Sequence, residues 1–211
     1  TGAQLANALN EAAIIAGRAG REAMAREDLD EALLRQSVGS QQARRLNQKE
    51  RRIVAYHEAG HALCRHLVGG DPPEILSIIP RGPALGFVAH SPAEDSYLES
   101  RQELQNELVA LLGGRAAEEE VFGTTFSGAS GDLARVHAIC KQMVGEFGMG
   151  VALDAEGAPP IALPTGDYAL SDRTRRDVDV AAMMLARNAH RRARSLLTAN
   201  RECLDDLAAN A

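Results

Sequence analysis

The chain has 211 residues, of which 45% are hydrophobic and 25% charged, and its formal net charge is −6. This length and composition suit one large or two small domains with a hydrophobic core, and the acidic balance excludes the basic surface typical of nucleic-acid-binding proteins. The three cysteines, Cys64, Cys140 and Cys203, never form C-x-x-C, which argues against a disulfide framework or a thiolate zinc site and favours small core residues in a reducing compartment.

The composition also predicts a mainly α fold. Aromatic residues make up only 3% and tryptophan is absent, while alanine and leucine are abundant, so helices packed by aliphatic side chains are expected. No apolar run approaches the roughly 20 residues of a membrane helix, and the first residues do not form a signal peptide. Any membrane contact would therefore come through sequence outside this chain.

The first 45 residues predict a two-helix module followed by a linker. Residues 1–20 place Leu5, Leu9 and three alanines on one helical face, with Thr1 as N-cap, and a second helix is expected over residues 28–37 with Leu29, Ala32 and Leu33 inward. The charged, Gln-rich residues 38–45 are typical of a linker. We therefore divide the chain into residues 1–45 and 46–211.

A long helix that carries H-E-x-x-H is predicted next. Asn47 and Glu50 form a capping box ahead of it. His57 and His61 lie four positions apart, so one helix face can present both imidazoles to a single cation. Glu58 lies about 100° round the helix, where a general base would stand in zinc-assisted peptide hydrolysis. A motif with only three fixed positions also occurs by chance. The mostly apolar residues on either side, however, predict a buried helix, in which these polar groups need partners.

Two short β-prone runs, residues 74–80 and 84–90, follow and predict a hairpin or small sheet. The strand edge could pair with an extended peptide substrate, and Ile78, Ile79 and Gly86 are then the expected substrate contacts. The alternative, a strand that only packs on the core, remains equally open.

A capping box at Ser100 predicts a helix to about Phe122, and the two glycines inside it, Gly113 and Gly114, indicate a close approach of another group. Glu118 and Glu119 on this helix are either surface acids or groups that orient a ligand histidine. A further helix is expected from Ser130, its N-cap, to about residue 147. An irregular loop then spans residues 148–169, and a long helix over residues 171–199, with Met183 and Met184 in the core, precedes a short last helix.

A catalytic zinc site needs a third protein ligand. The metzincin motif, H-E-x-x-H-x-x-G-x-x-H, is excluded, because this chain has Cys64 and Leu67 at the positions where that motif has Gly and its third His. His66 lies on a different face from the H-E-x-x-H pair. The remaining candidates are His90, Glu118, Glu119, Asp132 and His137. Asp132 has a physical advantage, because the helix dipole favours an ionised carboxylate in a first turn, but such an Asp is also a routine helix-start residue.

Five runs of the chain, taken in order, resemble the peptidase domain of the FtsH-type ATP-dependent zinc metalloproteases. They are A-Y-H-E-A-G-H-A, S-I-I-P-R-G-P-A-L-G-F, L-L-G-G-R-A-A-E-E, S-G-A-S-G-D-L and M-V-G-E-F-G-M-G. The opening T-G-A-Q-L-A-N-A-L-N-E-A-A is similar to the end of the family's AAA+ lid subdomain. The resemblance implies that His57, His61 and Asp132 are zinc ligands, that Glu58 is the catalytic carboxylate, and that Glu118 or Glu119 lies near the zinc.

The resemblance further implies an ATP-dependent zinc endopeptidase that cleaves unfolded or membrane proteins as a homohexamer, anchored in a bacterial inner membrane with this domain in the cytoplasm. ATP would serve the parent protein only, because no G-x-x-x-x-G-K-[ST] occurs here. Gly131 departs from the family's usual Asn, and the loop after residue 148 diverges. The alternative from another class is a non-catalytic module for hexamer assembly, with a structural metal or none.

Overall fold

The computed structural model describes residues 1–41, 46–70, 73, 75–81, 85–89, 98–150 and 171–211. Its elements are α1 (Gly2–Arg18), α2 (Arg26–Val38), α3 (Gln48–Leu67), β1 (Ile75–Ser77), β2 (Phe87–Ala89), α4 (Arg101–Phe122), the short 3₁₀ turn η1 (Ser127–Ala129), α5 (Ser130–Gly145), α6 (Asp172–Ala199) and α7 (Arg201–Ala209). The mainly α fold with one small sheet is therefore confirmed.

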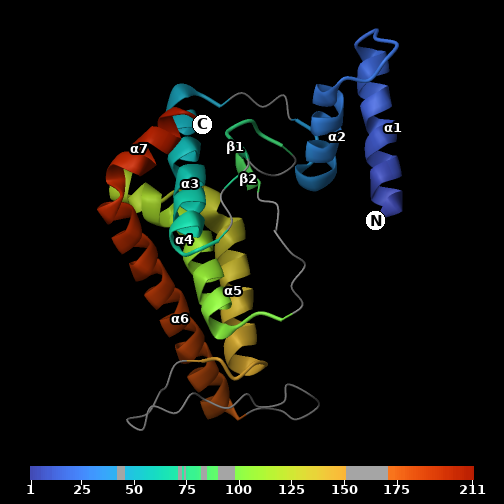
Figure 1. Cartoon of the computed structure of the whole chain (residues 1–211). Coiled ribbons are helices and arrows are strands. Elements are labelled where there is room, and N and C mark those ends of the chain that lie inside the picture. Colours follow the sequence, from blue (N-terminus) through green and yellow to red (C-terminus); the bar gives the residue numbers. More distant parts are fainter. Residues whose placement is uncertain (42–45, 71–72, 74, 82–84, 90–97, 151–170) are drawn as a thin grey trace.

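The larger part of the fold is a helical bundle centred on α4, with α3, α5 and α6 around it (Figure 1). Leu108 and Ala116 of α4, Met143 of α5 and Leu197 of α6 are fully or almost fully buried in one continuous core. Helix α7 packs back against α3. Burial of aliphatic side chains, at roughly 25 cal/mol per Å² of apolar surface, supplies the main stabilisation of such a bundle.

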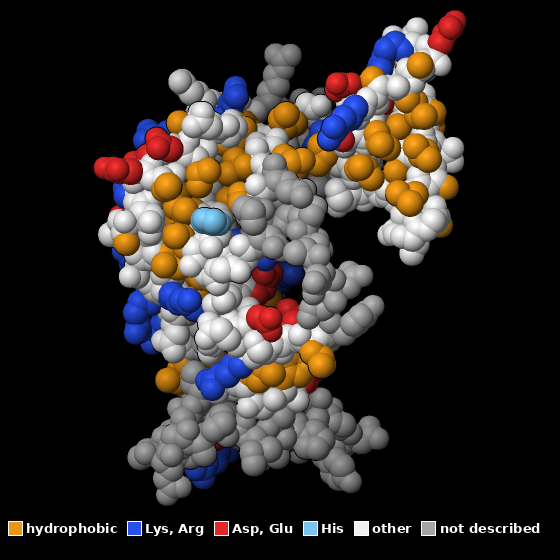
Figure 2. Space-filling view, in the orientation of Figure 1, with side chains coloured by type: hydrophobic (Ala, Val, Ile, Leu, Met, Phe, Trp, Pro, Cys, Tyr) orange, Lys and Arg blue, Asp and Glu red, His pale blue; other side chains and the backbone are white. Residues whose placement is uncertain are grey.

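Helices α1 and α2 pack against each other and stand apart from the bundle (Figure 1). Thr1 caps α1, as the sequence predicts, and Gly20 follows the end of this helix in a left-handed conformation. Ala8, Ala12 and Ala16 are buried between the two helices. Leu5, Leu9 and Leu33, predicted to face inward, are 64%, 49% and 45% exposed, because their side of the pair meets no other element among the described residues (Figure 2).

The predicted hairpin is present as two short antiparallel strands. Ile75 pairs with Ala89, Leu76 with Val88, and Ser77 with Phe87. Both strands lie against α3, which places the small sheet beside the H-E-x-x-H motif. Residues 74, 84 and 90 of the predicted runs lie outside the described residues, as do residues 82–83 between the runs, residues 42–45 of the predicted linker and residues 151–169 of the predicted loop.

Several side-chain predictions are wrong. Met183 and Met184 are 60% and 40% exposed rather than in the core, because they fall on the solvent side of α6. Cys203 is exposed, whereas Cys64 and Cys140 are buried as predicted. Ser130 does not cap α5: the 3₁₀ turn η1 precedes that helix and makes Ser130 its first residue, with Ala129 in the cap position.

None of the helices in the described part of the chain has the combination of length and apolar character needed to cross a membrane.

Candidate metal centre

The H-E-x-x-H motif lies in the middle of α3, which begins after the predicted capping box of Asn47 and Glu50. His57 is buried, and His61 and Glu58 are partly buried. A helix interior fixes backbone positions closely, so the one-turn spacing of the two histidines directs both imidazoles to the same side. The motif therefore supplies two of the three groups of the centre.

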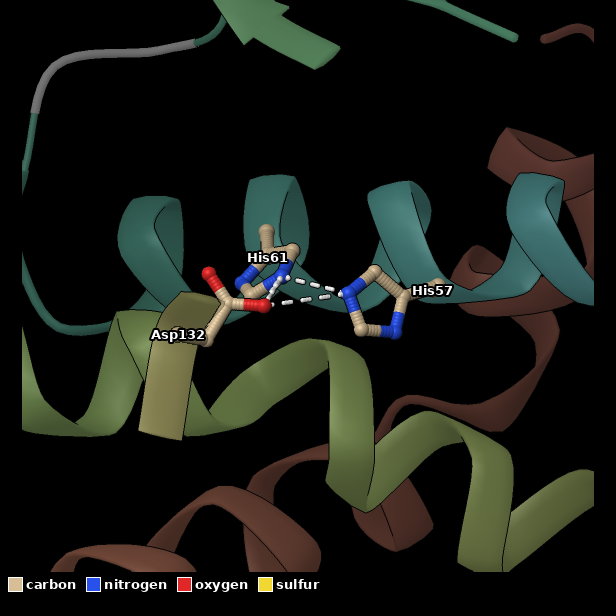
Figure 3. A group of neighbouring side chains, drawn as sticks. All are labelled: His57, His61 and Asp132. Carbon is tan, nitrogen blue, oxygen red and sulfur yellow. Dashed lines mark hydrogen bonds and ion pairs between the residues drawn. The ribbon is translucent and has the colours of Figure 1, made fainter. Parts of the chain in front are cut away.

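The third group comes from α5. Asp132 lies in the first turn of that helix, and its side chain points to the two imidazoles (Figure 3). Its Oδ2 lies 3.3 Å from His57 Nε2 and 3.5 Å from His61 Nε2, and the two Nε2 atoms are 3.1 Å apart. These three residues form the one group of histidine, cysteine or acidic side chains in the described ranges that is arranged to hold a metal ion.

Hydrogen bonds on the far side of each imidazole fix its orientation. His61 Nδ1 donates to the Ala110 carbonyl at 2.8 Å, and His57 Nδ1 donates to Glu118 Oε1 at 2.8 Å. Since a carbonyl oxygen can only accept, the proton of neutral His61 sits on Nδ1 and leaves Nε2 free as a ligand atom. A ligand histidine in a metal site is commonly held in this way.

Glu118 is almost completely buried, with 1% of its surface exposed. Besides His57, its carboxylate accepts a hydrogen bond from the backbone N–H of Phe126 at 2.8 Å. Both oxygens therefore have partners, which a buried carboxylate requires. Glu119, one residue further along α4, faces away: it accepts a hydrogen bond from Arg115 and lies 3.3 Å from His190 Nε2 of α6. Of the two acids considered from the sequence, Glu118 is thus the one that touches the centre.

The glycines of α4 explain how the helices approach so closely. A methyl group at Gly114 would lie 2.5 Å from His61 Nε2 and 2.7 Å from His57 Nε2, so only glycine leaves room for the imidazoles. One residue earlier, Gly113 lies against the main chain of Gly60 in α3. The close approach that the two glycines indicate is therefore present, and the group that approaches Gly114 is the centre itself.

The carboxylate of Glu58 lies beside Gly86, the residue directly before β2. A side chain at Gly86 would lie 2.8 Å from Glu58 Cγ and 2.9 Å from its Oε1. Burial raises the pKa of Glu58, and the neighbouring Asp132 charge adds to this effect, while His61 and His57 oppose it. A carboxylate of raised pKa accepts a proton more readily at neutral pH than an exposed one does.

The electrostatics favour a cation at the centre. Burial lowers the pKa of His57, but hydrogen bonds to Asp132 and Glu118 outweigh burial and raise its pKa to about 9. Burial tends to raise the pKa of Asp132, but the close contacts with the imidazoles of His57 and His61 outweigh burial and hold its pKa below the usual range. Asp132 is therefore ionised at neutral pH, as a carboxylate ligand must be.

The other third-ligand candidates lie elsewhere. His137 is exposed on α5, Glu119 faces α6, and His90 lies outside the described residues. His66, set aside from the sequence, is exposed. Sequence reasoning missed the Ala110 carbonyl and the contact between Gly86 and Glu58. No side-chain pattern signals a backbone acceptor, whereas a glycine in a short β-prone run was a signal of close approach.

A buried H-E-x-x-H helix, joined by a carboxylate from a second helix and a buried acid behind one histidine, defines the metallopeptidase class. Residues 44–210 match the family model of peptidase family M41. The chain therefore belongs to peptidase family M41.

Curated relatives align along nearly the whole chain. It is 42% identical to the ATP-dependent zinc metalloprotease FtsH 2 of Sorangium cellulosum, with 99% of this chain and 37% of that protein covered. It is 39% identical to FtsH of Thermotoga maritima, covering 98% of this chain and 35% of the relative. The chloroplastic FTSH 2 of rice is also 39% identical, with 98% and 32% covered. The chain thus spans about a third of the length of these relatives.

Proposed function

We propose that this chain is the peptidase part of an ATP-dependent zinc metalloendopeptidase that hydrolyses peptide bonds of unfolded or membrane proteins. The observation that carries the proposal is the meeting of His57, His61 and Asp132 at distances of 3.1 to 3.5 Å, with Glu58 on the same helix as the two histidines. Membership of family M41 and the names of the relatives support it.

The donor set fits zinc. Two imidazole nitrogens and one carboxylate oxygen are a common ligand set of catalytic zinc sites, in which the fourth position is left for water. His57, His61 and Asp132 would hold the ion, and Glu118 would orient His57 from behind. Bound zinc supplies Lewis acidity, which activates water for attack on an amide carbonyl.

Glu58 is the proposed proton carrier of the reaction. Its carboxylate accepts a proton from the attacking water and later gives that proton to the leaving amine. Because burial raises the pKa of Glu58, its carboxyl group takes up a proton more readily than an exposed one does, which suits both steps. Hydrolysis of an amide needs this second proton transfer, since an amine anion is a very poor leaving group.

The strand pair beside Glu58 is the proposed substrate site. Ile75 of β1 and Ile79, two residues after β1, are 39% and 43% exposed, so β1 and the residues that follow it offer both backbone groups and apolar side chains to an extended peptide. Ile78, Ile79 and Gly86 are the proposed contacts. The closeness of Gly86 to Glu58 supports this assignment, because a peptide lying along the sheet would pass near the carboxylate.

The wider assembly is part of the same proposal. Residues 1–45 would be the end of an AAA+ lid and its linker, and residues 46–211 the peptidase domain. ATP would be used by the parent protein outside this chain, which would work as a homohexamer anchored in a bacterial inner membrane with the peptidase domain in the cytoplasm. The family resemblance supports these points, and the M41 match from residue 44 supports the boundary.

Substitution of Glu58 by Gln tests the proposal. A short unstructured peptide needs no unfolding, so we expect the wild-type chain loaded with zinc to cleave it without ATP. Loss of a general base typically costs about 10² to 10⁴ in rate. Glu58→Gln should therefore lower kcat by at least about two orders of magnitude while zinc, measured by atomic absorption, stays bound one per chain.

Glu99→Gln, at an exposed acid outside the centre, is the matched control and should cleave at the wild-type rate. Cleavage by Glu58→Gln at the wild-type rate would refute its role. A wild-type chain that forms hexamers but cleaves neither peptide nor casein would favour the alternative, a non-catalytic assembly module.

A further inference from the structure

Arg81 carries a buried positive charge that lies outside the metal centre. Only 5% of its surface is exposed. Its guanidinium binds Glu31 through two hydrogen bonds, Nη2 to Oε2 at 2.6 Å and Nη1 to Oε1 at 3.2 Å. Its Nε is buried without a hydrogen-bond partner among the described residues. A buried guanidinium is costly unless it is paired, so Glu31 is the group that permits this position.

The pair joins two parts of the molecule. Glu31 belongs to α2, and Arg81 follows β1 by four residues. Arg81 Nη1 also lies 3.5 Å from the Gly39 carbonyl, and the main chain of Arg81 forms an isolated antiparallel bridge with Gln41. Arg81 is therefore attached by its side chain to α2 and by its main chain to the residues that directly follow α2.

Further ion pairs fix Glu31 within that helix pair. Arg35 donates to Glu31 at 2.8 Å and to Glu11 of α1 at 2.9 Å. The hydrogen bond from Arg81 is the largest cause of a lowered pKa at Glu31, so Glu31 is charged across the neutral range. The row Glu11, Arg35, Glu31 and Arg81 thus runs from α1 through α2 to the strand segment.

The strand segment in turn touches Glu58. Leu76 of β1 packs on the core of the bundle and pairs with Val88 of β2. Gly86, directly before β2, lies against Glu58 and Val54 of α3 without space for a side chain. A shift of the strand pair would therefore change the surroundings of the Glu58 carboxylate.

We propose that Arg81 is a positioning residue, whose ion pair with Glu31 couples the N-terminal helix pair to the strand pair beside Glu58. Displacement of α1 and α2 then shifts the backbone that confines Glu58. The part of this inference that concerns catalysis rests on the proposed peptidase function, while the mechanical coupling does not.

The test compares Glu31→Gln, Arg81→Gln and the double variant in the full chain. Hydrogen exchange followed by mass spectrometry should show faster exchange of the amides of residues 75–77 and 87–89 in all three, and unchanged exchange in α4. Cleavage of the short peptide should fall by about fivefold or more through kcat, with zinc content unchanged. The double variant should lose no more than either single variant, since both remove the same contact.

Arg81→Lys keeps the charge but loses the forked geometry, so an intermediate effect is expected. Arg26→Gln is the matched control, because Arg26 pairs with Asp30 on the exposed side of the same helix α2, and it should behave as wild type.

The coupling would be overturned if the strand amides of Glu31→Gln or Arg81→Gln exchanged hydrogen at the wild-type rate. It would also be overturned if the losses of the two single variants added up in the double variant. A fall in thermal stability with kcat unchanged would overturn the positioning role. If the wild-type chain cleaves no peptide, the proposed function fails and hydrogen exchange alone decides the coupling.

Discussion

The imidazoles of His57 and His61 rest directly on the main chain of α4 at Gly114, because a single hydrogen atom replaces a side chain there. This contact fixes how far the two rings can lie from α4, and therefore where their Nε2 atoms meet Asp132. The same contact explains why a helix interior tolerates a residue that costs about 1 kcal/mol relative to alanine.

Substitution of Gly114 by Ala tests this contact. The added methyl group would lie 2.5 to 2.7 Å from the two Nε2 atoms, so the imidazoles must move. We expect zinc affinity to fall by about 10- to 100-fold, comparable to the loss of a supporting group around a metal site. Competition with a fluorescent chelator measures the affinity.

Gly145→Ala is the matched control. It changes a glycine of α5 that has open space around it, so it should leave zinc affinity unchanged and add up to about 1 kcal/mol of stability. Unchanged zinc affinity in Gly114→Ala would contradict the packing argument.

At the scale of elements, one carboxylate of α7 adds hydrogen bonds to the packing of this helix against α3. Asp205 accepts hydrogen bonds from the Tyr56 hydroxyl at 2.8 Å and from Arg201 Nε at 3.0 Å. Tyr56 precedes His57 and packs edge-on against Phe122 of α4. Helix α7 thus supports the turn of α3 that carries His57.

The pH dependence of Asp205→Asn tests this support. Burial tends to raise the pKa of Asp205, but hydrogen bonds from Tyr56 and Arg201 outweigh it, so the pKa is lower in the folded than in the unfolded chain. The contribution of Asp205 to stability is therefore fully present above the ordinary pKa of about 3.9 and is lost as pH falls through the folded-state pKa.

Since the side chain of Asp205 is 43% exposed, solvent screening limits the loss to about 1 kcal/mol at pH 7. The midpoint of thermal unfolding of Asp205→Asn should lie about 2 to 4 °C below wild type at pH 7 and approach it below pH 4. Asp206→Asn, on the exposed side of α7, is the control. If the midpoint of thermal unfolding of Asp205→Asn lay equally far below that of wild type at all pH values, the charge of Asp205 would not be the source of the stabilisation.

The sequence predicted helices well where local signals decide them. Capping boxes at Asn47 and Ser100 mark the starts of α3 and α4 as observed. Local signals do not decide which element covers an apolar face, so the exposure of Leu5, Leu9 and Met183 could not be predicted. Helix α5 begins at Ser130 as expected, but the cap role predicted for Ser130 is wrong, because a 3₁₀ turn before that helix leaves no distinct pattern in the sequence.

In the candidate site, too, local sequence predicts some contacts, while others depend on how the helices pack. H-E-x-x-H brings His57 and His61 together by helical geometry alone. The approach of Asp132 depends on how α5 packs on the bundle, so the residues themselves left five candidates open. Glu118 and Glu119 differ by about 100° around α4, and only the orientation of that helix against α3 directs the first toward His57 and the second toward α6.

At the scale of the whole molecule, a bound ion would link α3 to α5. A ligand that binds only the folded chain stabilises it by about 2.7 kcal/mol at a free concentration of 100 times Kd. Removal of zinc by a chelator should therefore lower the midpoint of thermal unfolding by about 5 to 10 °C.

Asp132→Ala lacks one of the three donors and should bind less than one zinc per chain. The chelator should therefore lower its midpoint of thermal unfolding only slightly. Calorimetry with and without the chelator measures both proteins. A full zinc complement in Asp132→Ala would move the third ligand to another residue.

The crossing of α3 and α4 at Gly60 and Gly113 has a consequence for how the centre is loaded. Because the two main chains lie in direct contact there, neither helix can slide or roll without collision, and the histidines sit on a rigid joint. An incoming ion thus finds both imidazole donors already in place, with the Asp132 carboxylate 3.3 to 3.5 Å from their Nε2 atoms.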